Sequence, residues 1–191
     1  MSASSQSPPL LNAFQAERAL FHTADGADDG VMNQGTFLAQ AWALSRDLPA
    51  GGHLINLCND RYLFALAFAG ALIRGAVSLF PPNRLAATCN ELARGYPEVT
   101  CLTDTPLEGL RPPTCPISIP PIAGDAPPQM PLIPADREAF IAFTSGNTGR
   151  PNPHPKYWGD LVGCAHAAKR RFGFGSGQSI VATVPPQHMY G

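Results

Sequence analysis

The spacing of apolar residues along the chain changes near residue 50. Before that point, Leu10 to Phe21 carries apolar side chains at helical spacing and predicts a short helix. Gly35 to Leu48 predicts an amphipathic helix, which Pro49 terminates. Residues 1–9 show no such pattern, and we expect them to form a disordered tail. The polar stretch 23–30 is predicted to be a loop.

After residue 50, short apolar runs alternate with longer helical segments. The predicted order is strand 53–58, helix 60–75, strand 76–82, helix 85–97 and strand 99–104. The strands lack polar alternation, which is typical of a sheet covered on both faces. The Asn59–Asp60 pair directly follows the first strand, where a helix N-cap belongs. Short connections favour right-handed βαβ crossovers, so the predicted fold class is α/β, a parallel sheet with helices on both faces.

A proline-rich stretch, 106–138, separates this region (10–105) from the last part of the chain (139–191). Proline cannot donate to a strand ladder and disfavours helix at the preceding residue, so we expect an extended connection. A strand at 139–146, a helix at 156–173 with a basic end, and a strand at 179–191 follow. Ligands of α/β folds bind beyond the carboxyl ends of the strands. The chain stops at such an edge with no covering helix, and we expect it to be truncated.

Composition narrows the possible partners. The net charge is −1 and the pI is near 6.5, which gives no electrostatic reason to expect nucleic acid or an anionic membrane. Charged residues make up 14% of the chain, against about 25% in average soluble domains. Two interpretations remain open. Either a partner or a missing part of the chain covers some of the surface, or the 21 prolines dilute the charge.

The cysteines and the apolar segments indicate a cytoplasmic location. The five cysteines have no CxxC spacing, which argues against a zinc site or a redox dithiol, and we expect them to be reduced and mostly buried. The N-terminus lacks the basic start and apolar run of a signal peptide. The longest apolar stretch, Tyr62 to Ile73, is too short to span a bilayer.

The stretch FTSGNTGRPNPHPK, Phe143 to Lys156, has the composition of an anion-binding loop. It follows a predicted strand, and its glycines let backbone N–H groups approach phosphate oxygens. The hydroxyls of Thr144, Ser145 and Thr148 add neutral donors, and Lys156 can add charge.

Known loop motifs do not match this spacing. Gly146 and Gly149 are too close for a Walker A loop and no lysine follows them, while the GxGxxG fingerprint and the GxSxG elbow are absent. On spacing alone, an ordinary β–α turn remains an alternative.

Two motifs in order resemble signatures of one family. FTSGNTGRP resembles the phosphate-binding signature of the adenylate-forming superfamily, which includes acyl-CoA synthetases, peptide-synthetase adenylation domains and luciferases. Its usual form is a strand followed by TSG[ST]TGxPK. ATVPPQHMYG (182–191) resembles the next signature, a strand followed by a proline-containing loop with His and then Gly. The resemblance covers essentially the whole chain, but only the N-terminal part of such an enzyme.

The resemblance assigns a set of residues to the phosphates of ATP: Thr144, Ser145, Gly146, Asn147, Thr148 and Gly149. Asn147 replaces the usual Ser or Thr and can still donate to a phosphate. Asn152 stands where the lysine is usual, which removes a positive charge, and Lys156 is the candidate replacement. His188 would lie beside the carboxylate of the acyl substrate and the path of the thiol; the alternative is a loop histidine without a special role. His22, His53, His154 and His166 show no ligand spacing.

The function that the resemblance implies is that of an ATP-dependent acid:AMP ligase. Such enzymes join a fatty or aryl carboxylate to the α-phosphate of ATP, expel pyrophosphate, and transfer the acyl group to the thiol of CoA or a carrier protein. ATP and Mg²⁺ are the implied cofactors, with the magnesium ligands outside this chain and no metal site within it. We expect the chain alone to be inactive and to need its missing C-terminal half or a partner subunit.

Two other interpretations stay open at this point. The chain can be a short, non-catalytic phosphate- or acyl-binding module, or one subunit of a split enzyme. It can also be a flavodoxin-like scaffold in which the glycine loop is only a turn.

Overall fold

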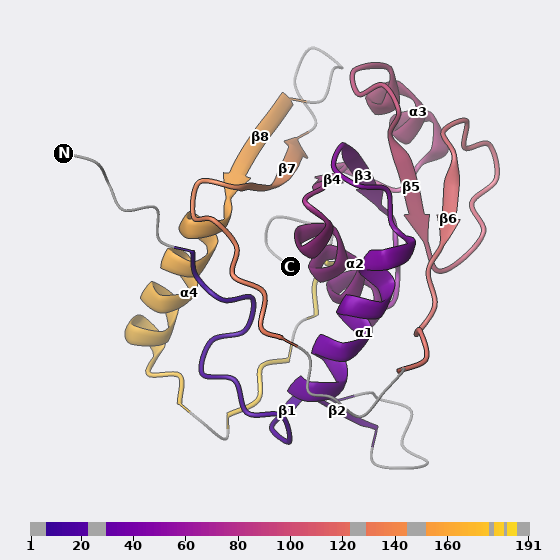
Figure 1. The fold of residues 1–191 in the computed structure, drawn as a ribbon. Helices are drawn as coiled ribbons and strands as arrows, with labels where there is room; N and C mark the ends of the chain where they lie inside the picture. Colours follow the sequence, from indigo (N-terminus) through magenta and orange to yellow (C-terminus); the bar gives the residue numbers. More distant parts are fainter. Residues whose placement is uncertain are drawn as a thin grey trace.

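The computed structural model describes residues 7–22, 30–122, 129–144, 152–175, 178–181 and 183–186. Its main feature is a sheet built from β3 (His53–Asn56), β4 (Val77–Phe80), β5 (Thr100–Thr103), β6 (Thr114–Pro116), β7 (Glu138–Thr144) and β8 (Asn152–Tyr157). The strand order is β6-β5-β3-β4-β7-β8 (Figure 1). All neighbouring strands pair in parallel except β7 and β8, which are antiparallel. Two further strands, β1 (Ala19–His22) and β2 (Val31–Asn33), form a separate antiparallel pair.

Helices cover both faces of the sheet, as predicted. They are α1 (Gln34–Asp47), α2 (Arg61–Arg74), α3 (Ala86–Arg94) and α4 (Trp158–Phe172). Two neighbouring residues of β3 show which helix covers which face, because successive side chains of a strand point to opposite sides. Leu54 packs in the core cluster that contains α1 and α2, whereas Ile55 packs in the cluster that contains α3.

The ends of α2 follow from local chemistry. The side chain of Asp60 accepts a hydrogen bond from the N–H of Leu63 at 2.8 Å, which confirms the predicted N-cap. At the other end, Gly75 adopts a φ of 81° and donates its N–H to the carbonyl of Leu72. Glycine suits this left-handed position because it has no Cβ. These two residues set the helix between β3 and β4.

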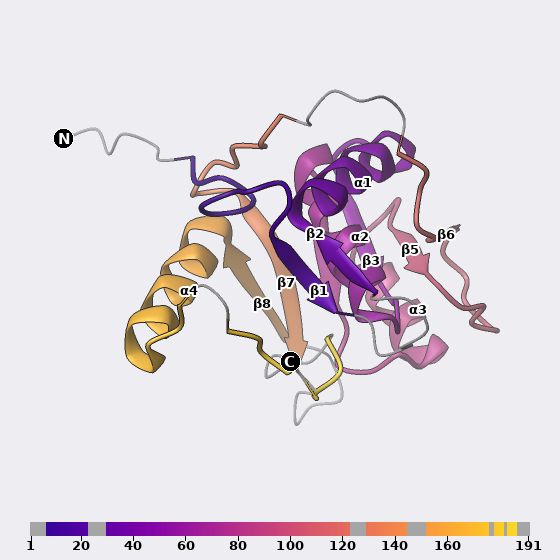
Figure 2. The ribbon, with the colours of Figure 1, turned by 90° about the horizontal axis from the view of Figure 1, so that it is seen from below.

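The last helix is fixed at its start. The N–H of Trp158 donates to the carbonyl of Arg137, the N–H of Gly159 donates to the carbonyl of Ala135, and the Trp158 indole donates to the carbonyl of Pro8. Trp158 is buried, while Tyr157 beside it is exposed. Figures 1 and 2 show α4 at the β8 end of the sheet, and α3 and β6 at the other end.

Strand β8 contains two prolines at alternate positions. Pro153 pairs with Phe143 of β7, and Pro155 pairs with Ile141. Proline has no N–H to donate, and the N–H groups of a strand point alternately to its two sides. The donors of β8 toward β7 are therefore limited to the intervening residues, Asn152, His154 and Lys156.

The helix predicted for Leu10 to Phe21 is wrong. This segment makes turns and then enters β1, and Ala13 adopts a φ of 49°, which a right-handed helix does not allow. The N–H of Leu10 donates to the carbonyl of Pro131, and Pro9 forms a bridge with Leu132. Pairing with a distant segment therefore determines the backbone here. Residues 1–6 of the predicted disordered tail lie outside the described residues, whereas the carbonyl of Pro8 accepts a hydrogen bond from the N–H of Ile133, so the tail does not extend to residue 9.

Three further elements differ from the prediction. The proline-rich connection contains β6, which pairs with β5. The helix predicted from Lys156 begins only at Trp158, because the preceding residues form β8. The strand predicted for 179–191 is absent from its described parts, 179–181 and 183–186. Ile180 and Val181 are 71% and 85% exposed there, so no packing or strand partner holds an extended backbone. No helix within the described ranges is long and apolar enough to cross a membrane.

Candidate functional site

The parallel strands bring their carboxyl ends to one edge of the sheet. The chain passes from β3 to β4 on one side, and then crosses to β5 on the other side of β3. Such a reversal of strand order opens a crevice at the carboxyl ends, where α/β proteins bind ligands. β7 lies next to β4, so Thr144, its last residue, belongs to the same edge.

Polar side chains tie this edge together. One carboxylate oxygen of Asp104, which follows β5, accepts the N–H groups of Asn59 and Asp60 at 2.7 and 2.6 Å. Arg84, which follows β4, donates to the amide oxygen of Asn59. Arg61 at the start of α2 donates to the carbonyl of Val184 at 2.6 Å. The beginning of the second signature therefore also lies at this edge.

The buried thiols near this edge are unreactive at neutral pH. Burial, and to a smaller extent the nearby Asp104 carboxylate, raises the pKa of Cys58 to about 12. Burial likewise raises the pKa of Cys89 to about 11 and that of Cys101 to about 12. Since the thiolate is the nucleophilic form, these three cysteines provide no nucleophile at neutral pH.

A hollow of about 340 Å³ opens beside the start of α2. Its apolar lining comes from Met32, Tyr62, Leu63 and Ile119, and its polar lining comes from Asp60, Asp104 and Thr105. The volume lies at the small end of the range of known ligand pockets. The hollow thus adds an apolar cavity to the edge at which Thr144 lies.

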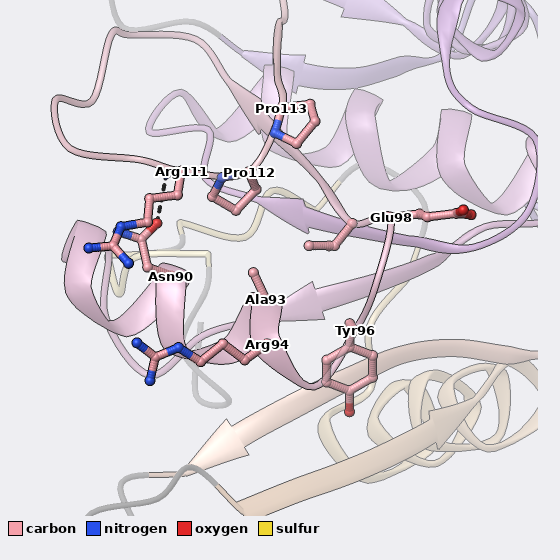
Figure 3. Close-up of a pocket in the computed structure, with 9 residues that line it drawn as sticks. Asn90, Ala93, Arg94, Tyr96, Glu98, Arg111, Pro112 and Pro113 are labelled. Carbon is pink, nitrogen blue, oxygen red and sulfur yellow. Dashed lines mark hydrogen bonds between the residues drawn. The ribbon is translucent and has the colours of Figure 1, made fainter.

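A second hollow, of about 290 Å³, lies elsewhere (Figure 3). It is formed by the end of α3 and by residues that precede β5 and β6, so it belongs to the amino edge of the sheet. The Asn90 side chain donates to the carbonyl of Gly109 and accepts from the N–H of Arg111, both at 2.8 Å, which holds one wall in place. Tyr96, which lines this hollow, packs edge-on against Phe143 of β7, with ring centroids 5.9 Å apart.

Only two of the predicted site residues lie within the described part of the chain. Thr144 is exposed, and its Oγ1 lies 3.3 Å from Nε2 of His154. Lys156 is half-buried and pairs with Phe140. It lies four residues along β8 from Asn152, the partner of Thr144, which is a distance of about 13 Å. Ser145, Gly146, Asn147, Thr148 and Gly149 lie outside the described residues, as does His188.

The structure therefore brings His154, rather than Lys156, next to Thr144. His154 was not assigned from the sequence, because the run PNPHPK was not predicted to form a strand. Alternation along β8 would have placed residues 152, 154 and 156 on one side. Within the described ranges, no group of three or more His, Cys, Asp or Glu side chains is arranged to hold a metal ion. The described residues thus do not supply a Mg²⁺ site.

No family model and no curated protein matches the sequence. Solved structures do match. O-succinylbenzoate CoA synthetase (MenE) from Bacillus subtilis, in complex with AMP, superposes with a TM-score of 0.67 at 14% identity and covers 90% of this chain. ATP-bound MatB from Rhodopseudomonas palustris gives 0.70 at 15% identity over 94% of the chain. The N-terminal subdomain of NpsA from Klebsiella oxytoca gives 0.55 at 17% identity over 74%.

The matches cover only part of each of these proteins. This chain spans 47% of the MenE chain, 39% of the MatB chain and 37% of the NpsA chain. The chain therefore has the fold of the N-terminal part of the adenylate-forming ligases.

Proposed function

We propose that this chain is the N-terminal, phosphate-binding part of an ATP-dependent acid:AMP ligase. The observation that carries the proposal is the position of the TSGNTG motif. It directly follows β7, at the carboxyl edge of a sheet that has the fold of these ligases. A β–α turn of a flavodoxin-like scaffold does not account for this combination of fold and motif.

In this proposal the loop binds the β- and γ-phosphates of ATP while pyrophosphate leaves. Thr144, Ser145 and Thr148 donate hydroxyl hydrogen bonds, and Gly146 and Gly149 allow backbone N–H groups to approach. Fixed donors of this kind stabilise the charge that develops on the leaving group. Lys156 lies about 13 Å along β8 from Asn152, which exceeds the Debye length of about 8–10 Å at ordinary salt, so salt weakens the effect of its charge on the phosphates. ATP supplies the leaving group and Mg²⁺ is expected to accompany it, held by residues outside the described chain.

The proposed acid substrate and thiol acceptor are inferred from the proteins with similar structures. The neighbours include a fatty acyl-adenylate ligase from L. pneumophila and an o-succinylbenzoate CoA synthetase, which act on a fatty and an aryl acid. We infer a fatty or aryl carboxylate as substrate, and CoA or a carrier-protein thiol as acceptor. His188 is proposed to lie beside the carboxylate. Because the chain spans less than half of the MenE chain, adenylation is proposed to need further residues, on the same chain or on a partner subunit.

Two measurements test the proposal. Calorimetric titration of the 191-residue chain with inorganic pyrophosphate should show binding that Gly146→Ala and Gly149→Ala weaken. Equal affinity of the unchanged chain and both variants would refute the role of the loop. The chain alone should not catalyse acid-dependent exchange of pyrophosphate into ATP, and measurable exchange would refute the need for further residues.

A further inference from the structure

Among the described residues, the side chain of His154 lies within hydrogen-bonding distance of the Thr144 hydroxyl and can decide what that hydroxyl donates to. Thr144 ends β7, His154 is the third residue of β8, and their Oγ1 and Nε2 atoms are 3.3 Å apart. Both side chains are exposed. The contact links the two strands on either side of the glycine loop.

The register of the two strands places these groups on one face. Ala142 pairs with His154, and Thr144 pairs with Asn152. Since alternate residues of a strand share a face, Thr144, Asn152, His154 and Lys156 lie on the same side of the β7–β8 pair. Asn152 carries no charge, and Lys156 is about 13 Å farther along the strand. His154 is therefore the basic side chain nearest to the loop on this face of the described strands.

A hydroxyl group has only one hydrogen to donate. If Thr144 donates it to Nε2 of His154, none remains for a ligand. If instead Nε2 carries the hydrogen and donates to Oγ1, the Thr144 hydrogen is free to turn toward an anion. The tautomer of His154 thus decides whether Thr144 serves as a phosphate donor.

We propose that His154 is a positioning residue of the phosphate site. Its Nε2–H donates to Thr144 Oγ1 and directs the Thr144 hydroxyl to an oxygen of a pyrophosphate or triphosphate group. This inference rests on the proposed function, because it assumes that the loop after Thr144 receives phosphate.

Two substitutions at His154 isolate the donor. His154→Gln keeps an N–H near the position of Nε2, whereas His154→Leu removes it at similar size. We expect His154→Leu to weaken pyrophosphate binding by about tenfold, which corresponds to about one net hydrogen bond, and His154→Gln to restore most of the affinity. His166→Leu, at an exposed position of α4, is the matched control and should bind as the unchanged chain does.

A spectroscopic measurement on the unchanged chain does not depend on any variant folding. The ¹⁵N chemical shifts of the imidazole distinguish the two tautomers of histidine. Addition of inorganic pyrophosphate should move His154 toward the form with hydrogen on Nε2 and leave His166 unaffected. A histidine that only supports the fold would show no such change.

The outcomes separate the two proposals. If Gly146→Ala weakens pyrophosphate binding but His154→Leu does not, or if the His154 shifts do not respond, the role of His154 is overturned and the phosphate loop stands. If the unchanged chain does not bind pyrophosphate, the proposed function itself is overturned, and the role of His154 falls with it.

Discussion

Two glycines of α4 allow a direct test of how this helix is attached to the sheet. A Cβ at Gly159 would lie 2.9 Å from Cβ and 3.0 Å from the carbonyl oxygen of Ala135. A Cβ at Gly163, one turn later, would meet no heavy atom of the described residues within 4 Å, apart from the backbone of its own helix and its chain neighbours. Gly159→Ala and Gly163→Ala therefore add the same methyl group to the same helix in opposite surroundings.

The expected effects have opposite signs. Overpacking at Gly159 should cost about 1–3 kcal/mol. The Gly159 N–H also donates to the carbonyl of Ala135 at 2.8 Å, so the backbone cannot retreat without weakening a bond worth about 1 kcal/mol. At Gly163 the better helix propensity of alanine should stabilise the protein by up to about 1 kcal/mol. The two variants should thus differ by roughly 1–4 kcal/mol.

Urea unfolding, followed by circular dichroism and by tryptophan fluorescence, measures this difference. Trp158 is buried beside Gly159, so its fluorescence should report the local loss of packing in Gly159→Ala. A Gly159→Ala variant as stable as Gly163→Ala would refute the close approach of α4 to Ala135, and with it the anchoring of the end of β8.

Four further predictions concern the rest of the fold. Asp60→Ala removes the N-cap of α2 and should lower the free energy of unfolding by about 1 kcal/mol, while Asp60→Ser should retain most of it; equal losses would argue against capping. Phe80→Ala removes a ring stacked on Phe140, with centroids 4.6 Å apart, and should cost about 3–5 kcal/mol in the same urea assay; a cost below about 1 kcal/mol would contradict the packing. At pH 8, iodoacetamide followed by mass spectrometry should find the exposed Cys164 modified and Cys58, Cys89 and Cys101 protected, and modification of Cys58 at an equal rate would contradict its burial. Stability should also fall as the pH rises above 9, because the unfolded thiols ionise near their ordinary pKa of 9.0 while burial holds the pKa of Cys58 and Cys101 at about 12, so the unfolded state loses protons first.

The central part of the fold could be predicted because its information is local. Between residues 53 and 104, apolar strands alternate with helices, and Asp60 marks the start of the first helix. Each of these local patterns favours one type of secondary structure, and short connections favour right-handed crossovers. The segment from Leu10 to Phe21 was different. Its apolar residues do contact the core, but pairing with residues 131–133 selects turns and a strand over a helix. The helical spacing of its apolar residues carries no information about pairing with so distant a segment.

The candidate site was only partly predictable for a related reason. The TSGNTG motif indicates a phosphate loop through residue types alone. His154 lies beside Thr144 only because residues 152–157 form β8. This strand was hard to predict, because a run with two prolines is typical of a loop rather than a strand. The strand forms because β7 has an unpaired edge beside it. The two prolines fall at alternate positions, so the N–H groups that they lack are not those that would donate to β7.

The same prolines restrict how the sheet can grow. On the side of β8 that faces away from β7, Pro153 and Pro155 present carbonyl oxygens and no N–H groups. A further strand, from a second copy or from another part of a longer protein, would find its own carbonyl groups without donors along these positions. Strand addition at this edge is therefore disfavoured, as it is at other proline-bearing edges. A partner that contacts this side at Pro153 and Pro155 finds backbone acceptors but no backbone donors, so it has to bring its own hydrogen-bond donors or recognise side chains.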